Sequence, residues 1–89
     1  MRKVEIGGIY KHFKGHIYQV IAVAYDTEKY TIDDPNASRL VIYENLETKE
    51  VWARPYSMFV SRVDREKYPD CKQTYRFEEY NFEKGEIKW

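Results

Sequence analysis

The ten residues HIYQVIAVAY, at positions 16–25, form the longest apolar run in the chain. β-Branched and aromatic residues dominate this run, and such residues favour strands. Its side chains alternate between two apolar faces, with Tyr18, Val20, Ala22 and Ala24 on one and Ile17, Ile21, Val23 and Tyr25 on the other. A strand with two apolar faces needs cover on both sides. We therefore predict that this run is the central strand of a sheet.

The segments on either side of this run predict a hairpin and a loop. Gly8–Phe13 alternates apolar and polar residues up to the Lys14–Gly15 pair, where glycine accepts the positive φ of a tight turn. Asp26–Ser38 is polar and contains the run Asp-Asp-Pro-Asn, which disfavours regular structure. We expect a strand before the turn and a surface loop after the central strand.

A second hairpin follows the loop. Arg39–Asn45 and Val51–Arg54 have the composition of strands, and Leu46–Glu50 reverses the chain between them. Pro55 has no backbone donor and disfavours helical backbone at the residue before it. The strand is therefore expected to stop there, and a short helical turn is expected to begin.

The C-terminal third is less regular. Met58 and Phe59 are expected to point inward from the helical turn, and Val60–Val63 predicts a short strand. Asp64–Thr74 is a charged excursion. Tyr75–Trp89 fits either an edge strand or an irregular tail, and the sequence leaves both alternatives open.

The whole composition favours a sheet. Val, Ile, Thr, Tyr, Phe and Trp total 33 residues, whereas Ala, Leu and Met total 8. With 89 residues the chain has room for one domain. Five or six short strands predict a mainly β fold, a small closed or half-closed antiparallel barrel, because closure removes exposed edges. We expect a single domain over residues 1–89, with the barrel core at about 8–63 and an extension at 64–89.

Charge and cysteine usage exclude several classes of protein. Cys71 is the only cysteine, so neither an intramolecular disulfide nor a cysteine-rich zinc site is expected, and a reducing, cytoplasmic setting fits best. No stretch approaches the roughly 18 apolar residues of a membrane span, and the N-terminus lacks an apolar signal segment. The net charge is zero, although residues 1–23 and 51–76 each carry +3 and residues 24–50 carry −4. Zero net charge removes the simplest argument for nucleic acid.

Catalytic motifs are not apparent. A nucleophile such as Cys71 needs a nearby base, and the only candidate imidazoles are His12 and His16. These two histidines flank the Lys14–Gly15 turn, but two imidazoles without a third ligand make a poor metal site. We expect no metal site and no cofactor. The simplest expectation for His12 is a ring that orients the neighbouring turn by a hydrogen bond.

The most suggestive group is aromatic. Tyr10, Tyr18, Tyr43, Trp52, Tyr56 and Phe59 lie on or beside predicted strands. Because a small domain needs rings for its core, Tyr18, Trp52 and Phe59 are expected inside, whereas Tyr43 and Arg54 are expected at the surface. Whether the cluster is core or groove stays open. The candidate binding residues are Tyr43, Trp52, Arg54, His12 and Lys14.

Three ordered motifs carry a family resemblance. GIYKHFKGHIYQV begins at Gly8, LVIY begins at Leu40, and WARPYSMF begins at Trp52. Together they resemble the bacterial domain-of-unknown-function family sixteen fifty-three over about residues 8–63, and the Arg76–Phe77 pair is a weaker echo of it. Ala53 replaces the family's usual Val, and Asp26–Ser38 is longer than its acidic loop. The resemblance implies an SH3-like β-barrel and no established activity.

These features lead us to expect a non-catalytic module that binds a peptide or a protein partner in a shallow groove with Tyr43, Trp52 and Arg54. Arg54 would offer its planar fork to a carboxylate. An alternative is a nucleic-acid-associated barrel in which the basic segments 1–23 and 51–76 meet on one face. A second alternative is a small metal-dependent or thiol enzyme, which rests on His12, His16 and Cys71 only. No membrane partner is expected.

Overall fold

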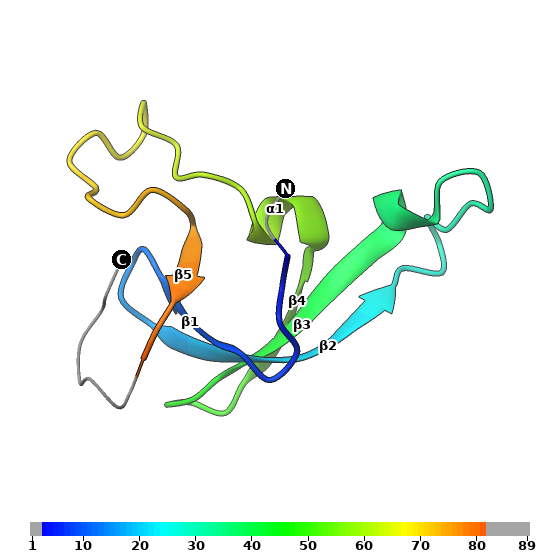
Figure 1. Ribbon diagram of the computed structural model, residues 1–89, viewed down its shortest axis with the longest axis horizontal. Coiled ribbons are helices and arrows are strands. Elements are labelled where there is room, and N and C mark those ends of the chain that lie inside the picture. Colours follow the sequence, from blue (N-terminus) through cyan, green and yellow to red (C-terminus); the bar gives the residue numbers. More distant parts are fainter. Residues whose placement is uncertain (1–2, 82–89) are drawn as a thin grey trace.

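Five strands form one antiparallel sheet in the computed structural model, which describes residues 3–81 (Figure 1). The strands are β1 (Ile9–His12), β2 (Ile17–Tyr25), β3 (Arg39–Asn45), β4 (Val51–Pro55) and β5 (Phe77–Glu79). Their order in the sheet is β4-β3-β2-β1-β5, so β2 lies in the middle. The predictions of a mainly β fold and of a central strand are confirmed.

The chain reverses between strands at two turns that the local residues stabilise. Between β1 and β2, Gly15 has a φ of 108°, and its N–H donates to the His12 carbonyl at 2.8 Å. Between β3 and β4, the Asn45 Oδ1 accepts the N–H groups of Glu47 and Thr48 at 2.8 and 3.1 Å. A side-chain carbonyl that takes backbone donors in this way replaces the ladder bonds that a turn cannot form.

A bulge in β2 changes which side chains face the core. Val20 pairs with Tyr43 and Ala22 pairs with Ile42, so Ile21 is an extra residue between them. Val20 is buried and Val23 also packs against the core, whereas Ile21 is exposed. The prediction that Val23 shares a face with Ile21 is therefore wrong, because one inserted residue moves the following side chains to the other face.

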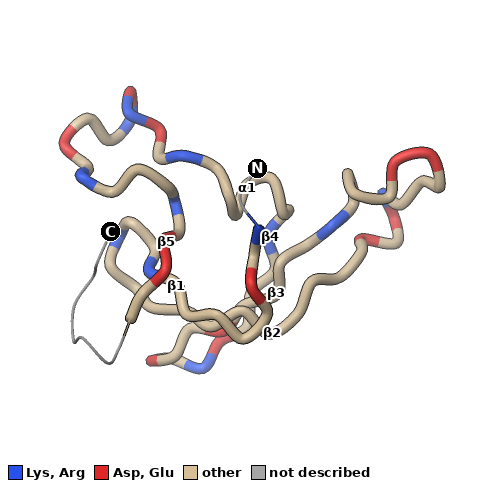
Figure 2. The backbone as a smooth tube through the Cα atoms, in the orientation of Figure 1, with Lys and Arg blue, Asp and Glu red and all other residues tan. Residues whose placement is uncertain are grey.

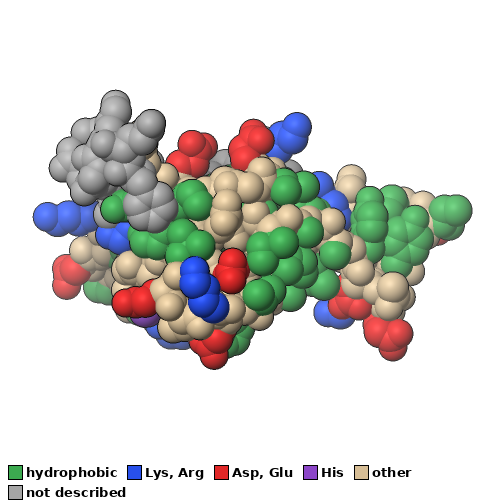
Figure 3. All heavy atoms as spheres, turned by 90° about the horizontal axis from the view of Figure 1, so that it is seen from below, with side chains coloured by type: hydrophobic (Ala, Val, Ile, Leu, Met, Phe, Trp, Pro, Cys, Tyr) green, Lys and Arg blue, Asp and Glu red, His purple; other side chains and the backbone are tan. Residues whose placement is uncertain are grey.

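The outer face of the sheet keeps some apolar surface. Figure 3 shows hydrophobic side chains gathered along this side of the molecule. Ile21 and Val51 are among the exposed large hydrophobic residues. Exposed apolar side chains of this kind are common on small domains.

Two short helical segments begin at or directly after a proline. η1 (Pro35–Ser38) is a 3₁₀ turn inside the predicted loop, and α1 (Tyr56–Phe59) is the predicted helical turn after Pro55. Phe59 is buried as predicted, but Met58 is 46 % exposed, so its predicted inward orientation is wrong. In a single turn, residues three apart share a face, and here that face belongs to Tyr56 and Phe59. No helix within residues 3–81 has the length and hydrophobicity to cross a membrane.

The predicted strand Val60–Val63 does not form. This segment has only an isolated bridge between Arg62 and Tyr75. The reason is that α1 still holds the start of the segment, since the N–H groups of Val60 and Ser61 donate back to the carbonyls of Tyr56 and Met58. The C-terminal alternative is decided for residues 77–79, which pair with β1 as an edge strand. Residues 82–89 of the predicted tail lie outside the described residues.

The sheet curls, but closure into a barrel is not detected in residues 3–81, where β4 and β5 are the two edges. Figure 1 shows the N-terminal segment, α1 and the 60–76 segment on one side of the curled sheet. These segments cover its inner face. Val4 of the N-terminal segment is buried there, and its N–H donates to the Tyr56 hydroxyl at 2.9 Å.

The core is a cluster of rings. Phe59 and Phe77 are each 1 % exposed and stack with 4.1 Å between ring centroids and 8° between planes. Tyr10 and Tyr43 each contact Phe59 at 5.4 Å. Phe77 lies beyond the segment 8–63 in which the sequence places the barrel, so the core also includes the C-terminal third.

Replacing Phe77 with Ala should lower the free energy of unfolding by about 3–5 kcal/mol, because it leaves a cavity against Phe59 and Tyr43. Met58→Ala is the matched control in an exposed position and should change stability by about 0.5 kcal/mol or less. Denaturant titration followed by circular dichroism measures both. Equal effects of the two substitutions would contradict the packing described here.

Candidate functional site

One cavity of about 320 Å³ gathers all five candidate binding residues, which are His12, Lys14, Tyr43, Trp52 and Arg54. The other residues that line it are also aromatic or basic, namely Phe13, His16, Tyr18, Tyr68, Arg76 and Phe77. We call it the basic aromatic cavity. In the described part of the chain, no carboxylate is among its lining residues.

The pairing of β3 with β4 places Trp52 and Arg54 on the inner face of the sheet. Trp52 lies opposite Tyr43, and Arg54 lies opposite Val41, which is fully buried. Side chains of directly paired residues point to the same face. Both β4 side chains therefore extend over the same side as the core.

The expected exposures of the two aromatic residues are reversed. Tyr43, expected at the surface, is 5 % exposed, and Trp52, expected in the core, is 48 % exposed. Tyr43 lies on an interior strand, and its ring meets Phe59 and Phe77 at 5.4 Å each. Trp52 lies on the edge strand β4, which has a neighbour on one side only. Sheet position, rather than local alternation, decides these exposures.

Arg54 is held in place by the core, as its Nε donates to the Tyr43 hydroxyl at 3.2 Å. Its guanidinium lies 5.6 Å from the Phe77 ring centroid. Arg76 is held similarly, because its Nε donates to the Ser61 hydroxyl at 3.1 Å. Each guanidinium is thus fixed through Nε, which leaves the terminal nitrogens as donors for a ligand.

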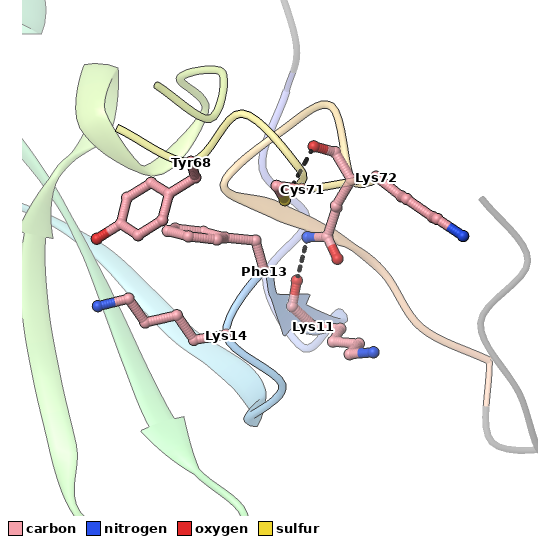
Figure 4. A pocket seen from close by; sticks show the side chains of 7 residues that line it. Lys11, Phe13, Lys14, Tyr68, Cys71 and Lys72 are labelled. Atoms are coloured by element: carbon pink, nitrogen blue, oxygen red, sulfur yellow. Dashed lines mark hydrogen bonds between the residues drawn. The ribbon is translucent and has the colours of Figure 1, made fainter. Parts of the chain in front are cut away.

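The side chain of Lys14 lies beside two aromatic rings, those of Phe13 and Tyr68. Its Nζ lies 5.5 Å from the Tyr68 ring centroid and 6.0 Å from that of Phe13, and the two rings meet edge to face at 4.9 Å. Figure 4 shows Lys14 extending along these two rings. The same three residues line a second cavity of about 550 Å³, which Lys11 and Lys72 also line.

His12 contributes a neutral imidazole to the site. Its Nδ1 accepts the Lys14 N–H at 3.1 Å, so the ring orients the turn, as expected from the sequence. Burial and the neighbouring charges of Arg54 and Arg76 lower the pKa of His12 from 6.5 to about 4. At neutral pH the ring is therefore neutral, and because Nδ1 accepts, Nε2 carries the proton.

Tyr18 is another polar residue that lines the basic aromatic cavity. It is only partly buried, so its predicted place in the core is correct in part, and its ring meets that of Tyr43 edge to face at 5.1 Å. Burial raises the pKa of Tyr18 above its ordinary value. Its hydroxyl therefore remains protonated at neutral pH.

Six lining residues are missing from the five sequence-based candidates: Phe13, His16, Tyr18, Tyr68, Arg76 and Phe77. The Arg76–Phe77 pair did stand out as a weak echo of the family motif. Tyr68 has no such signal, since it comes from the charged excursion. Cys71 lines the second cavity rather than the one with His12 and His16. Within residues 3–81 no three His, Cys, Asp or Glu side chains are grouped to hold a metal ion.

The chain belongs to the family described as Protein of unknown function (DUF1653), whose sequence model matches residues 8–79. The family resemblance drawn from the three motifs is confirmed, and the match extends over the Arg76–Phe77 pair. No curated protein and no solved structure matches the chain.

The lowered pKa of His12 should make stability depend on pH. Because the folded state disfavours the protonated ring, stability should be full above about pH 6.5 and should fall as pH decreases toward about 4. Denaturant titration at several pH values, together with an NMR titration of the imidazole, measures this. In His12→Asn, whose amide oxygen replaces Nδ1 as acceptor, that part of the pH dependence should disappear. An unchanged pH profile would contradict the assignment.

Proposed function

We propose that this member of the DUF1653 family is a non-catalytic binding module that holds an acidic peptide segment of a protein partner in the basic aromatic cavity. One observation carries the proposal. Lys14, Arg54 and Arg76 surround a cavity whose described lining includes no carboxylate. Three neighbouring cations in a cavity that no carboxylate of residues 3–81 lines favour a ligand that supplies negative charge.

The anchoring of Arg54 suits a carboxylate ligand. A planar guanidinium presents parallel donors that match the two oxygens of a carboxylate, which gives the pair direction as well as strength. The bond from Nε to the Tyr43 hydroxyl orders this side chain before any ligand arrives. Such ordering reduces the entropy that binding would otherwise cost.

The aromatic walls suit the uncharged part of a peptide. Trp52 is half exposed, and the rings of Phe13, next to Lys14, and Tyr68, from the 60–76 segment, meet edge to face in the lining of the cavity. Flat rings of this kind offer contact area with little loss of side-chain entropy, and Trp, Tyr and Arg dominate the energetic centres of protein interfaces.

The half-closed SH3-like barrel is part of the same proposal. The strand order β4-β3-β2-β1-β5 and the one-turn helix after β4 support it. SH3-like barrels commonly bind peptides, nucleic acids or protein partners. That analogy concerns the fold and does not identify a ligand. The residues of the cavity determine which ligand this chain can bind.

A second candidate function, binding of single-stranded nucleic acid, is favoured by the way the basic segments meet. Lys11 and Lys14 come from residues 1–23, and Arg54, Lys72 and Arg76 come from residues 51–76, yet they line two cavities with a shared wall. Figure 2 shows the basic positions of the 60–76 segment on the same side of the molecule as β5. Bases could stack on the exposed Trp52 ring.

Arg54→Ala should weaken binding of an acidic peptide by about tenfold or more, because it removes a charged hydrogen-bonding group. Arg62→Ala is the matched control, since Arg62 also lies beside a tyrosine ring, that of Tyr75, but does not line the cavity. Isothermal calorimetry with a library of acidic peptides measures both. Equal affinities for the two variants would contradict the proposed site.

The nucleic-acid candidate makes a different prediction. If it holds, affinity for a single-stranded oligonucleotide should fall by orders of magnitude as salt rises, because bound counterions are released. If the peptide proposal holds, an acidic peptide should bind the protein at physiological salt and the oligonucleotide should not displace it. Competition measured by fluorescence anisotropy separates the two functions.

A further inference from the structure

The strand β4 leaves part of its backbone without a neighbouring strand. It is the last strand in the sheet and pairs with β3 alone. The Asn45 N–H donates to the Glu50 carbonyl at 2.8 Å, so the Glu50 backbone points toward β3. Along β4, every second residue from Glu50 onward then directs its backbone groups toward β3. Two residues further along, Trp52 lies opposite Tyr43 and therefore also directs its backbone toward β3. The N–H and C=O groups of Val51 and Ala53 must then point away from the sheet.

This edge has little protection. Proteins usually cover open edges, bend them or place charges and prolines on them. Pro55 removes one donor at the end of β4, but Val51 and Ala53 are exposed and retain their N–H groups. Within residues 3–81, no turn or loop hydrogen bond uses these two N–H groups.

The open edge lies beside the basic aromatic cavity. Trp52 lies between Val51 and Ala53 in the sequence, and Arg54 follows Ala53. The side chains of Trp52 and Arg54 both line that cavity. A peptide extended along β4 would direct every second side chain to the inner face of the sheet, beside Trp52 and Arg54. Backbone pairing and recognition of charge would therefore occur in one bound segment.

We infer that an acidic peptide segment binds by adding a strand along Val51–Ala53, with alternate carboxylates entering the cavity. The inference rests on the proposed function of that cavity and specifies how its ligand is held. Charge complementarity selects the occupant. The cavity presents Lys14, Arg54 and Arg76, whereas pairing of two β4 edges from two copies would bring two basic cavities together.

Hydrogen exchange of the full-length chain tests the added strand directly. The probe is an acetylated and amidated heptapeptide of alternating Val and Asp, and the control is the same peptide with alternate backbone nitrogens methylated. At saturating peptide, exchange of the Val51 and Ala53 amides should slow by about tenfold or more, because they become hydrogen-bonded. The amides of Trp52 and Arg54 already bond to β3 and should change much less. Unchanged exchange at Val51 and Ala53 in millimolar peptide would overturn the inference.

Two substitutions separate this inference from the proposed function. Ala53→Pro removes an outward donor without removing a bond to β3 and should weaken peptide binding by about tenfold. Ala53→Val retains the donor and should bind the peptide more tightly than Ala53→Pro does. If Arg54→Ala weakens binding but Ala53→Pro and the exchange rates do not respond, cavity binding stands and the added strand is wrong. If Arg54→Ala has no effect while Val51 and Ala53 gain protection, the strand stands and the charge recognition is wrong.

The exchange measurement does not depend on any variant, so it decides the question even if Ala53→Pro fails to fold. Sedimentation of the chain alone provides a last control. Concentration-dependent dimers that protect Val51 and Ala53 without peptide would overturn the inference, because the edge would then bind a second copy. Binding of an oligonucleotide in place of the peptide, without protection of these amides, would also overturn it.

Discussion

The stacked pair Phe59 and Phe77 is the constraint on which the rest of the molecule depends. One ring comes from the helical turn after β4 and the other from β5, at the opposite edge of the sheet. Their contact draws the two edges toward each other without a ladder of hydrogen bonds between them. A short chain has few aliphatic residues for a core, so aromatic rings supply most of the buried volume. Tyr10 and Tyr43 complete this packing.

The same rings also build the candidate site. Phe77 belongs to the core and lines the cavity, and the Tyr43 hydroxyl fixes Arg54 at its rim. Burial, together with the positive charge around the cavity, keeps His12 neutral at neutral pH. Packing and recognition therefore share side chains. A substitution that loosens the core should also disorder the groups that face a ligand.

Local patterns in the sequence predict the strands well, because alternation and turn residues act over a few positions. They predict exposure poorly, since exposure depends on the order of strands in the sheet. Trp52 and Tyr43 are the clearest case: both sit on strands of suitable composition, but one strand is an edge. The loss of the strand Val60–Val63 also depends on a neighbouring element, because α1 already engages the N–H groups of Val60 and Ser61. The candidate residues share a type, aromatic or basic, and the fold collects them although His12 and Arg54 are 42 residues apart in the sequence. Arg76 and Tyr68 come from a segment whose path over the sheet has no periodic signal.

The bulge at Ile21 also separates the sheet into two parts with different roles. Beyond it, the ends of β2 and β3 extend away from the ring cluster as an arm that carries the 26–38 segment (Figure 1). The hydrogen bond from the Asp26 N–H to the Ser38 carbonyl closes the 26–38 segment at its base, and the rings of Tyr25 and Tyr30 meet edge to face there with 5.4 Å between centroids. Segments closed in this way accept changes of length at little thermodynamic cost, since loop-closure entropy rises slowly with length. Relatives can thus diverge in this arm while the cavity stays intact, and an engineer has a natural place to graft a reporter sequence.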